Sequence, residues 1–280
     1  MLVEGDIIKR LILAILFSLF LCLQAQAGDL VGYWNMDEAS GNLTDLSGHG
    51  TTCIAQGTPT YQVSSVEINR GKAIQLDNSG DYFNCGNNSI YDFTTAFTLM
   101  IWIYPTMSNP ASINQWYLLS HHSYPNAGWW LFLRGPTRRI SFFTEDGTIH
   151  GPEPSSPLWV TNRWHFIAAT SNGTTNTLYL DGVLIGSVAS GTLTSVSTSL
   201  FISSGISGRF EGLLDDIKIY NYALSAIQIQ HEYQQSRLAI FRKHEPWKWT
   251  DLLNLAFIMK GDQLYEKDNR ISYLRQHPSD

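Results

Sequence analysis

The chain has 280 residues, of which 15% are charged and 44% are hydrophobic, so it can bury a sizeable core in one large domain. Residues 28–236 contain 8 basic and 16 acidic side chains, and this excess of negative charge disfavours nucleic acid as a partner. Residues 237–280 contain 8 basic and 6 acidic side chains, and the change of charge and pattern places a boundary between the two segments.

The N-terminal segment has the features of a signal peptide over residues 1–27. Lys9 and Arg10 precede an apolar run over residues 11–23, and Ala25-Gln26-Ala27 fits the small-x-small rule for cleavage. The run is shorter than the roughly 20 apolar residues of a membrane-spanning helix, which disfavours the alternative of an uncleaved anchor. We therefore expect a secreted protein, extracellular, periplasmic or at the cell surface, with no transmembrane segment in the mature chain.

Two cysteines remain in the mature chain, Cys53 and Cys85, and each lies in a strand-like stretch. Export permits a disulfide. Sequence spacing does not decide whether they pair, because pairing depends on geometry. A disulfide and two buried free thiols therefore both stay open.

Residues 29–222 contain a succession of short apolar segments separated by turn residues, which is typical of antiparallel strands. Residues 97–104 are apolar on both faces and predict a central strand covered on both sides. Asp181-Gly182 lies between two apolar runs and predicts a tight hairpin turn. Almost no helical pattern precedes residue 222, so the predicted fold class is an all-β sandwich of two antiparallel sheets.

Five motifs, taken in order, resemble a known family. They are "YWNMDEASGN…DLSGHG", "GKAIQLDNSGDYFNCG", "FTLMIWIYP", "NRWHFIAATSNGTTNTLYLDGVLIGS" and "FEGLLDDIKIYNYALSAIQI". Together they resemble the laminin-G-like domains of the concanavalin A-like lectin/glucanase superfamily over residues 30–233. The resemblance implies a jelly-roll sandwich with a concave and a convex side, and it implies either a glycan-binding module or a glycoside hydrolase.

Catalytic acids are hard to find in this sequence. Glycoside hydrolysis needs two carboxylates about 5 to 9.5 Å apart. The resembled glucanases carry them as Glu-x-Asp-x-x-Glu on one strand, and this sequence has no such string. Glu145 and Asp146 are adjacent, as are His121 and His122, and adjacent strand residues point to opposite faces. The sequence favours a protein that is not an enzyme, and convergence of acids from distant strands stays open.

The last predicted strand carries a carboxylate on an apolar face, because alternate positions group Asp215 with Ile217 and Ile219. A buried carboxylate needs a partner. The resemblance implies a structural calcium ion near the first loop, with Asp215 in the position of an aspartate that helps to hold it. The other candidate ligands lie in that loop and are Asp37, Asn42 and Asp45. The alternative is that Asp215 accepts hydrogen bonds from the backbone of a neighbouring turn.

Carbohydrate sites combine aromatic rings, on which sugar rings stack, with polar side chains that bind hydroxyl groups. The resemblance assigns Trp34, Trp102 and Trp164 to the core. Strand alternation turns one of Trp129 and Trp130 inward and the other outward. The candidate platforms in loop-like or edge-like segments are Trp116, Tyr124, Trp129 and Trp159, with Arg134, Asp146 and His150 as candidate polar partners. Ordinary edge packing is the alternative for each ring, and the concave sheet and the rim loops both stay open as the location.

The C-terminal part has helix-like spacing. Ser225 precedes one such stretch and is predicted to cap it. Residues 237–280 are predicted to be a helical or poorly ordered tail, with a second candidate helix that Thr250 begins. This tail either packs on the sandwich, binds a partner protein or a membrane surface, or lacks order.

The sequence as a whole predicts an exported, non-catalytic, lectin-like module that binds a carbohydrate or glycoconjugate and is stabilised by a structural calcium ion. The alternative is an extracellular structural or adhesion domain that binds a protein partner. A glycoside hydrolase of the same fold is the third possibility.

Overall fold

The computed structural model describes residues 28–64, 71–107, 115–123, 125–156, 158–204 and 208–238. The predicted signal peptide, Tyr124 and residues 239–280 of the predicted tail lie outside these ranges. Contacts divide the chain into Met1–Arg237 and Leu238–Asp280. In the part that the structure describes, no helix is long and apolar enough to cross a membrane.

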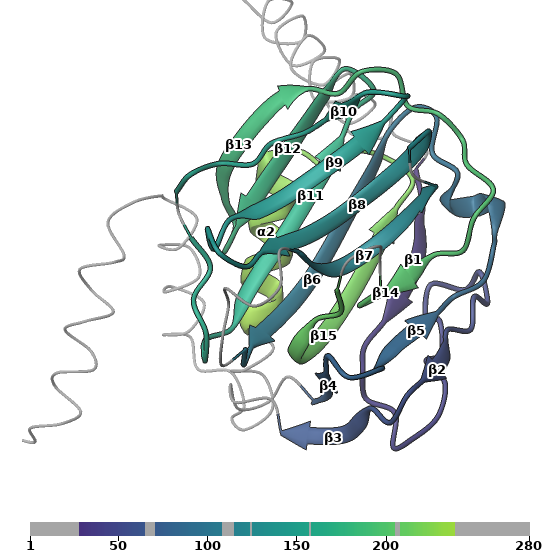
Figure 1. Cartoon of the computed structure of the whole chain (residues 1–280), viewed down its shortest axis with the longest axis vertical. Coiled ribbons are helices and arrows are strands. Elements are labelled where there is room, and N and C mark those ends of the chain that lie inside the picture. Colours follow the sequence, from purple (N-terminus) through teal and green to yellow (C-terminus); the bar gives the residue numbers. More distant parts are fainter. Residues whose placement is uncertain are drawn as a thin grey trace, which may run out of the picture. The chain divides into compact units, whose positions relative to one another are not determined.

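The strands form two antiparallel sheets, which confirms the predicted two-sheet sandwich (Figure 1). The first sheet has the order β13-β12-β11-β6-β15-β4-β3, and β1 also pairs with β15. Its strands are β1 (Leu30–Trp34), β3 (Thr60–Ser64), β4 (Lys72–Asp77), β6 (Phe97–Pro105), β11 (His165–Ser171), β12 (Thr175–Leu180), β13 (Val183–Ala189) and β15 (Glu211–Tyr220).

The second sheet has the order β10-β9-β8-β7-β14-β5-β2. Its strands are short at both edges and long in the middle. They are β2 (Ile54–Gln56), β5 (Tyr82–Asn84), β7 (Gln115–Ser123), β8 (Ala127–Arg134), β9 (Ile140–Glu145), β10 (Ile149–His150) and β14 (Phe201–Ile202). A short 3₁₀ helix, η1 (Ser89–Tyr91), and an α-helix, α2 (Ala226–Leu238), complete the described elements.

The central strand β6 is apolar on both faces, which predicts that both faces are covered. The structure confirms this. Phe97, Leu99 and Ile101 point into the core between the sheets. Met100 and Trp102 point outward into a second cluster, which α2 covers. Trp102 stacks on Tyr233 of α2 at 5.7 Å between ring centroids, and its Nε1 donates to the Ser236 hydroxyl at 3.2 Å. Trp34 and Trp164 are buried as well, which confirms the predicted core roles of all three tryptophans.

The sequence correctly predicted two local features, the β12–β13 turn and the start of α2. The β12–β13 turn is Asp181-Gly182, both with positive φ (51° and 78°), as a tight hairpin requires. At the start of α2, the Ser225 hydroxyl accepts from the Gln228 N–H at 3.4 Å, and the Gln228 side chain accepts from the Ser225 N–H at 2.9 Å. This reciprocal capping box confirms Ser225 as the cap.

The β15 strand contains a register shift between Asp215 and Lys218, and Asp216 has a φ of 45°. Leu214 lies in the inter-sheet core with Ile217 and Ile219, whereas Asp215 is opposite Trp102, whose side chain lies in the outer cluster. The prediction that Asp215 shares a face with Ile217 and Ile219 was therefore wrong. A β-bulge adds one residue and so breaks the strict alternation on which that prediction depended.

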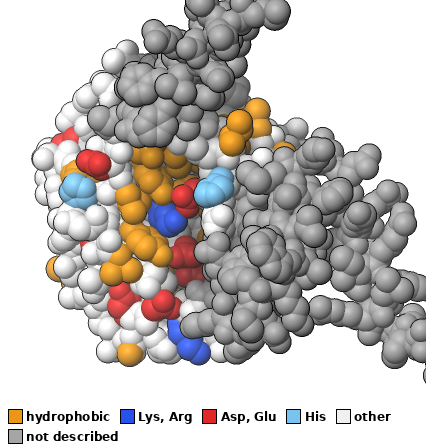
Figure 2. Space-filling model, turned by 180° about the vertical axis from the view of Figure 1, so that it is seen from behind, with side chains coloured by type: hydrophobic (Ala, Val, Ile, Leu, Met, Phe, Trp, Pro, Cys, Tyr) orange, Lys and Arg blue, Asp and Glu red, His pale blue; other side chains and the backbone are white. Residues whose placement is uncertain are grey.

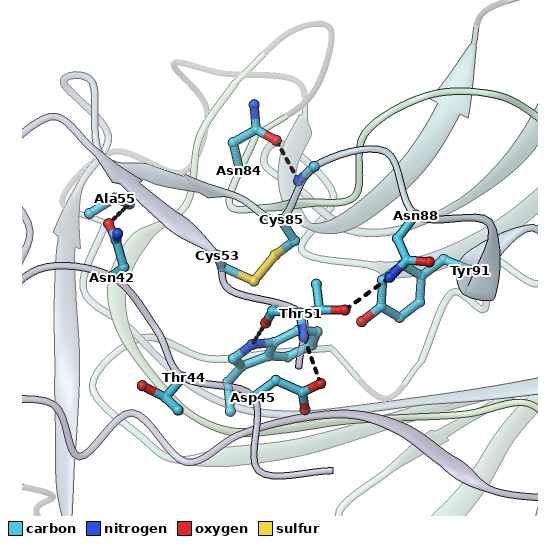
Figure 3. Close-up of a disulfide and its surroundings, with 12 residues drawn as sticks. Asn42, Thr44, Asp45, Thr51, Cys53, Ala55, Asn84, Cys85, Asn88 and Tyr91 are labelled. Carbon is cyan, nitrogen blue, oxygen red and sulfur yellow. Dashed lines mark hydrogen bonds between the residues drawn. A yellow bond between two sulfur atoms is a disulfide. The ribbon is translucent and has the colours of Figure 1, made fainter. Parts of the chain in front are cut away.

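Cys53 and Cys85 form a disulfide with a Cα–Cα distance of 3.8 Å, which confirms the pairing alternative (Figure 3). Cys53 also forms an isolated bridge with Leu43 of the first loop. Next to it, the Thr51 carbonyl accepts from Trp34 Nε1 at 3.2 Å. The disulfide therefore joins the first loop region to the end of β5. The buried Trp34 indole holds the same region through its hydrogen bond to Thr51.

Candidate functional site

Three of the four predicted aromatic platforms are core residues. The exposed fractions of Trp116, Trp129 and Trp159 are 1%, 2% and 0%. Trp116 packs edge-on against Trp159 at 5.9 Å, and Trp129 Nε1 donates to the Tyr91 carbonyl at 3.2 Å. These rings offer no face to a sugar, so the platform prediction was wrong for them; Tyr124 lies outside the described residues.

The residues that follow Trp116 and Trp129 in the sequence point away from the core. Tyr117 and Trp130 form, with Phe132 and Phe143, a separate cluster on the outer face of the second sheet. Tyr117 stacks on Phe132 at 5.7 Å, and Trp130 meets Phe143 edge-on at 5.6 Å. Strand alternation therefore operates as expected at Trp129 and Trp130 of β8, with the inward and outward members exchanged.

Phe143 is the accessible ring of this cluster. Tyr117, Trp130 and Phe132 are at most 4% exposed, whereas Phe143 is the one residue of β9 that is not buried. Trp130 and Phe132 both meet its ring edge-on, at 5.6 and 5.4 Å. Phe143 is thus held in one orientation by its neighbours and is partly exposed, which suits a stacking platform.

A second pair of rings lies on the same sheet, over β5 and β14. Tyr82 and Phe201 are partly exposed, and their ring centroids are 6.1 Å apart. Arg209 lies over the Tyr82 ring at 4.9 Å. Asn84 is the register partner of Phe201, and its amide nitrogen points away from the disulfide while its oxygen binds the Gly86 N–H (Figure 3).

One line of register partners connects the two groups of rings: Phe143 pairs with Trp130, Trp130 with Ser120, and Ser120 with Phe201. Side chains of such partners share a face of the sheet. We call this surface the aromatic face; its rings are Tyr82, Tyr117, Trp130, Phe132, Phe143 and Phe201.

The predicted polar residue Arg134 lies on the aromatic face. Its guanidinium lies 5.0 Å from the centre of the Phe132 ring, and its Nε donates to Glu153 at 2.8 Å. Glu153 also accepts from the Ser141 hydroxyl at 2.9 Å and from Arg139 at 3.4 Å. Burial alone would raise the pKa of Glu153, but these donors outweigh it and hold the pKa below its ordinary value.

A buried histidine–carboxylate contact borders Trp130 on the other side. His122 Nε2 lies 2.7 Å from Glu145 Oε2, each side chain is 3% exposed, and the His122 ring is 4.0 Å from the Trp130 ring. Burial lowers the pKa of His122, and the Glu145 carboxylate opposes this shift in part. The adjacent His121 points into the core and binds Asp92 at 2.7 Å, so the two histidines diverge as predicted.

Asp146 and His150, the other predicted polar residues, bind each other at 3.1 Å at the β9–β10 connection. The Asp146 carboxylate accepts from the Thr192 N–H at 2.9 Å, and this bond lowers its pKa. These contacts hold the loop that contains Thr192 against the β9–β10 connection. The structure therefore separates Asp146 and His150 from Arg134, with which the prediction had grouped them.

The predicted calcium ligands of the first loop bind backbone N–H groups of different segments. The pairs are Asp37 with Lys72 (2.6 Å), Asn42 with Ala55 (3.1 Å) and Asp45 with Thr51 (3.1 Å). Within the described ranges, no cluster of three or more His, Cys, Asp or Glu side chains could hold a metal ion. These side chains do not form a preformed metal cluster, so calcium stays a prediction.

Asp215, the fourth predicted ligand, is fully buried. It lies in the neighbourhood of Tyr33, whose hydroxyl donates to Asp216 at 3.1 Å. Burial raises the pKa of the Tyr33 phenol, and the Asp216 and Asp215 carboxylates raise it further. Asp215 and Asp216 thus belong to the polar part of the first sheet's outer face.

On the opposite side of the molecule from Figure 1, apolar side chains gather around a basic one with acidic side chains beside it (Figure 2). The outer face of the first sheet holds a shallow, open pocket. Its lining includes Trp102, Phe166 and the Lys218–Glu232 ion pair at 2.7 Å. Ligand sites are usually well-formed concave clefts, so this shallow pocket is the weaker candidate site.

Comparison with known proteins supports the sequence resemblance. A family model described as the concanavalin A-like lectin/glucanases superfamily matches residues 77–230. Comparison with curated proteins gives no match.

Several solved structures share the fold. The binding domain of Paraclostridial Mosquitocidal Protein 1 has a TM-score of 0.59 and 20% identity, over 74% of this chain and 52% of that chain. The binding domain of botulinum neurotoxin DC, solved in complex with rat synaptotagmin II, has a TM-score of 0.57 and 14% identity, over 74% and 52%. Domain 4 of AbnA, a GH43 extracellular arabinanase from Geobacillus stearothermophilus solved with arabinotriose, has a TM-score of 0.55 and 16% identity, over 74% and 98%. The chain spans about half the length of the two toxin domains.

Proposed function

Because this chain belongs to the concanavalin A-like lectin/glucanase superfamily, we propose that it is an exported, non-catalytic carbohydrate-binding module whose ligand binds on the aromatic face of the second sheet. The observation that carries this proposal is the juxtaposition of partly exposed rings and hydrogen-bonding groups across neighbouring strands. Sugar rings stack on such rings, and side chains such as Arg134 and Asn84 bind hydroxyl groups at their edges.

The similar structures support binding rather than catalysis. The arabinanase domain was solved in complex with arabinotriose, and the two toxin domains are described as binding domains. Their low identity supports only the fold for this chain, so the ligand class remains our proposal.

The acidic residues of the aromatic face also support a non-catalytic role. A glycosidase general acid needs a raised pKa so that it stays protonated near neutral pH. Glu153 has a lowered pKa because Arg134, Ser141 and Arg139 donate to it. Glu145 is occupied by its pair with His122. Both acids serve as anchors of neighbouring side chains.

The test is binding of the purified protein to a glycan and polysaccharide array, with Phe143→Ala and Tyr82→Ala as variants. The matched control is Tyr104→Ala, which removes a partly buried ring from the outer face of the first sheet. Loss of one stacking ring costs about 1.4 kcal/mol, so we expect each variant to bind about tenfold more weakly and the control to bind as the parent does.

Two results would contradict the proposal. One is glycan binding that both variants retain and the control loses. The other is no glycan binding by protein with a cooperative melting transition, which would shift the account to the extracellular domain that binds a protein partner.

A further inference from the structure

We propose that the ligand of the aromatic face is an acidic glycan, carrying a carboxylate or sulfate group, and that Arg209 binds this anion. The inference rests on the proposed function and names its ligand class. It is carried by the position of Arg209 and by the partners that this side chain lacks.

The backbone holds Arg209 at the aromatic face. Arg209 forms an isolated parallel bridge with Tyr117 of β7, and its N–H donates to Asn78 Oδ1 at 3.3 Å. Its guanidinium lies over the Tyr82 ring at 4.9 Å. The side chain therefore lies between the cluster around Phe143 and the Tyr82–Phe201 pair.

The charge of Arg209 has no carboxylate partner among the residues that the structure describes. Its Nε is buried and makes no hydrogen bond, although the residue as a whole is partly exposed. Among the described residues, Arg134 and Arg139 pair with Glu153, Arg163 with Asp181, and Lys218 with Glu232, whereas Arg138, like Arg209, lies over an aromatic ring, that of Trp159. Because Nε is closed to solvent, an anionic ligand would bind the other N–H groups of the guanidinium and neutralise its charge.

The nearest acids in the sequence are engaged elsewhere. Asp81 precedes Tyr82, but its carboxylate accepts the N–H groups of Thr58 (2.6 Å) and Asp77 (3.2 Å) and is 3% exposed. Strand alternation in β15 groups Glu211 with Leu213, which lies in the outer cluster of the first sheet, so the Glu211 side chain lies on the outer face of that sheet. The Asp81 carboxylate thus has a structural role, and no described ion pair joins Arg209 to either acid.

The surroundings of Arg209 suit one sugar unit with a charged group. The partly exposed rings of Tyr82 and Phe201 provide the stacking surface. The planar guanidinium can donate two parallel hydrogen bonds to a carboxylate or a sulfate, which an ammonium group cannot do. A neutral sugar would satisfy the rings but leave the Arg209 charge without a counterion.

Matched sets of oligosaccharides test this inference with the purified protein. One set is lactose, 3′-sialyllactose and 3′-sulfolactose, and a second is galactotriose and trigalacturonic acid. We expect the charged members to bind about ten- to a hundredfold more tightly than the neutral member, with a difference that shrinks at high salt. The carboxylated and sulfated arms show which anion is preferred.

The deciding variant is Arg209→Met, which keeps an unbranched apolar stem and removes the charge. We expect it to lose the preference for charged members while binding to neutral members persists. Arg163→Met is the control, because Arg163 is a largely exposed arginine that pairs with Asp181. Arg209→Lys keeps the positive charge but lacks the planar guanidinium that donates two parallel hydrogen bonds, so it should retain part of the preference. It provides a second test if Arg209→Met does not fold.

The outcomes separate the two proposals. Equal binding of neutral and charged members, or a charge preference that Arg209→Met and Arg209→Lys both retain in full, would overturn the role of Arg209 and leave carbohydrate binding intact. If no glycan of any charge binds to the folded protein, the proposed function fails and this inference fails with it.

Discussion

Trp129 and Trp130 are neighbours in β8 and occupy opposite faces of the second sheet. The sequence predicted that one ring turns inward and the other outward, and this is confirmed. It did not identify which, because both faces of β8 are apolar, with Leu131 inside and Phe132 outside. Hydrophobic alternation shows the core face only where the other face is polar. The predicted platforms Trp116 and Trp129 therefore each lie one residue before a ring that does face outward, Tyr117 and Trp130.

This arrangement has a direct consequence for stability. Trp129→Ala removes a fully packed core ring and should lower the free energy of unfolding by about 3–5 kcal/mol. Phe143→Ala removes a partly exposed ring and should cost less. Urea denaturation of both variants measures the two costs, and a larger loss for Phe143→Ala would contradict the assignment of inward and outward faces.

At the scale of elements, the regular features followed from the sequence and the irregular ones did not. The β12–β13 turn and the α2 cap depend on two to four local residues, such as Asp181-Gly182 and Ser225. The register shifts in β7 and β15 depend on pairing with neighbouring strands. A bulge leaves no local composition signal, so the face of Asp215 could not be read from its sequence spacing.

The capping box of α2 gives a prediction for that helix. Ser225→Ala removes the hydroxyl that accepts from the Gln228 N–H and should cost about 1 kcal/mol of stability. Gln230→Ala, an exposed position of the same helix, should change stability little. Equal melting temperatures for the parent and Ser225→Ala would show that this cap does not stabilise the fold.

The disulfide gives a second prediction at this scale. Cys53 and Cys85 are separated by 32 residues, and closing a loop of that length restricts the unfolded chain by about 3–4 kcal/mol. We expect Cys53→Ser/Cys85→Ser to be destabilised by this order, measured by denaturant titration. Reduction of the parent protein with dithiothreitol should give a similar loss, and an unchanged transition midpoint in both experiments would contradict the expectation.

At the scale of the whole molecule, buried histidines link stability to pH. Burial lowers the folded-state pKa of His121 and of His122, while Asp92 and Glu145 oppose the shift only in part. The unfolded chain therefore binds protons at higher pH than the folded chain does, near the ordinary histidine pKa of about 6.5. Stability should fall as the pH drops through this value and level off, as far as these two groups are concerned, below their folded-state pKa values.

Thermal melts between pH 8 and pH 5 measure this effect. His122→Gln removes one of the two titrating groups and should flatten the decline while leaving the neighbouring His121 contribution in place. A parent protein whose melting temperature rises between pH 7 and pH 5.5 would contradict the sign derived from the two histidines.

The predicted calcium ion belongs to the same scale because it would join the first loop to β15. A metal present at 100 times its dissociation constant would add about 2.7 kcal/mol to stability. We expect calcium to raise the melting temperature relative to chelator and Asp215→Asn to reduce that response. A melting temperature that calcium does not change, or a response that Asp215→Asn keeps in full, would remove calcium from the account.

The most direct measurement of the central claim is hydrogen–deuterium exchange of the protein with and without a glycan selected from the array. We expect the bound glycan to protect backbone amides of β5, β9 and β14, which carry Tyr82, Phe143 and Phe201, while the first sheet exchanges as before. Protection confined to the first loop or to the outer face of the first sheet would contradict the aromatic face as the binding site.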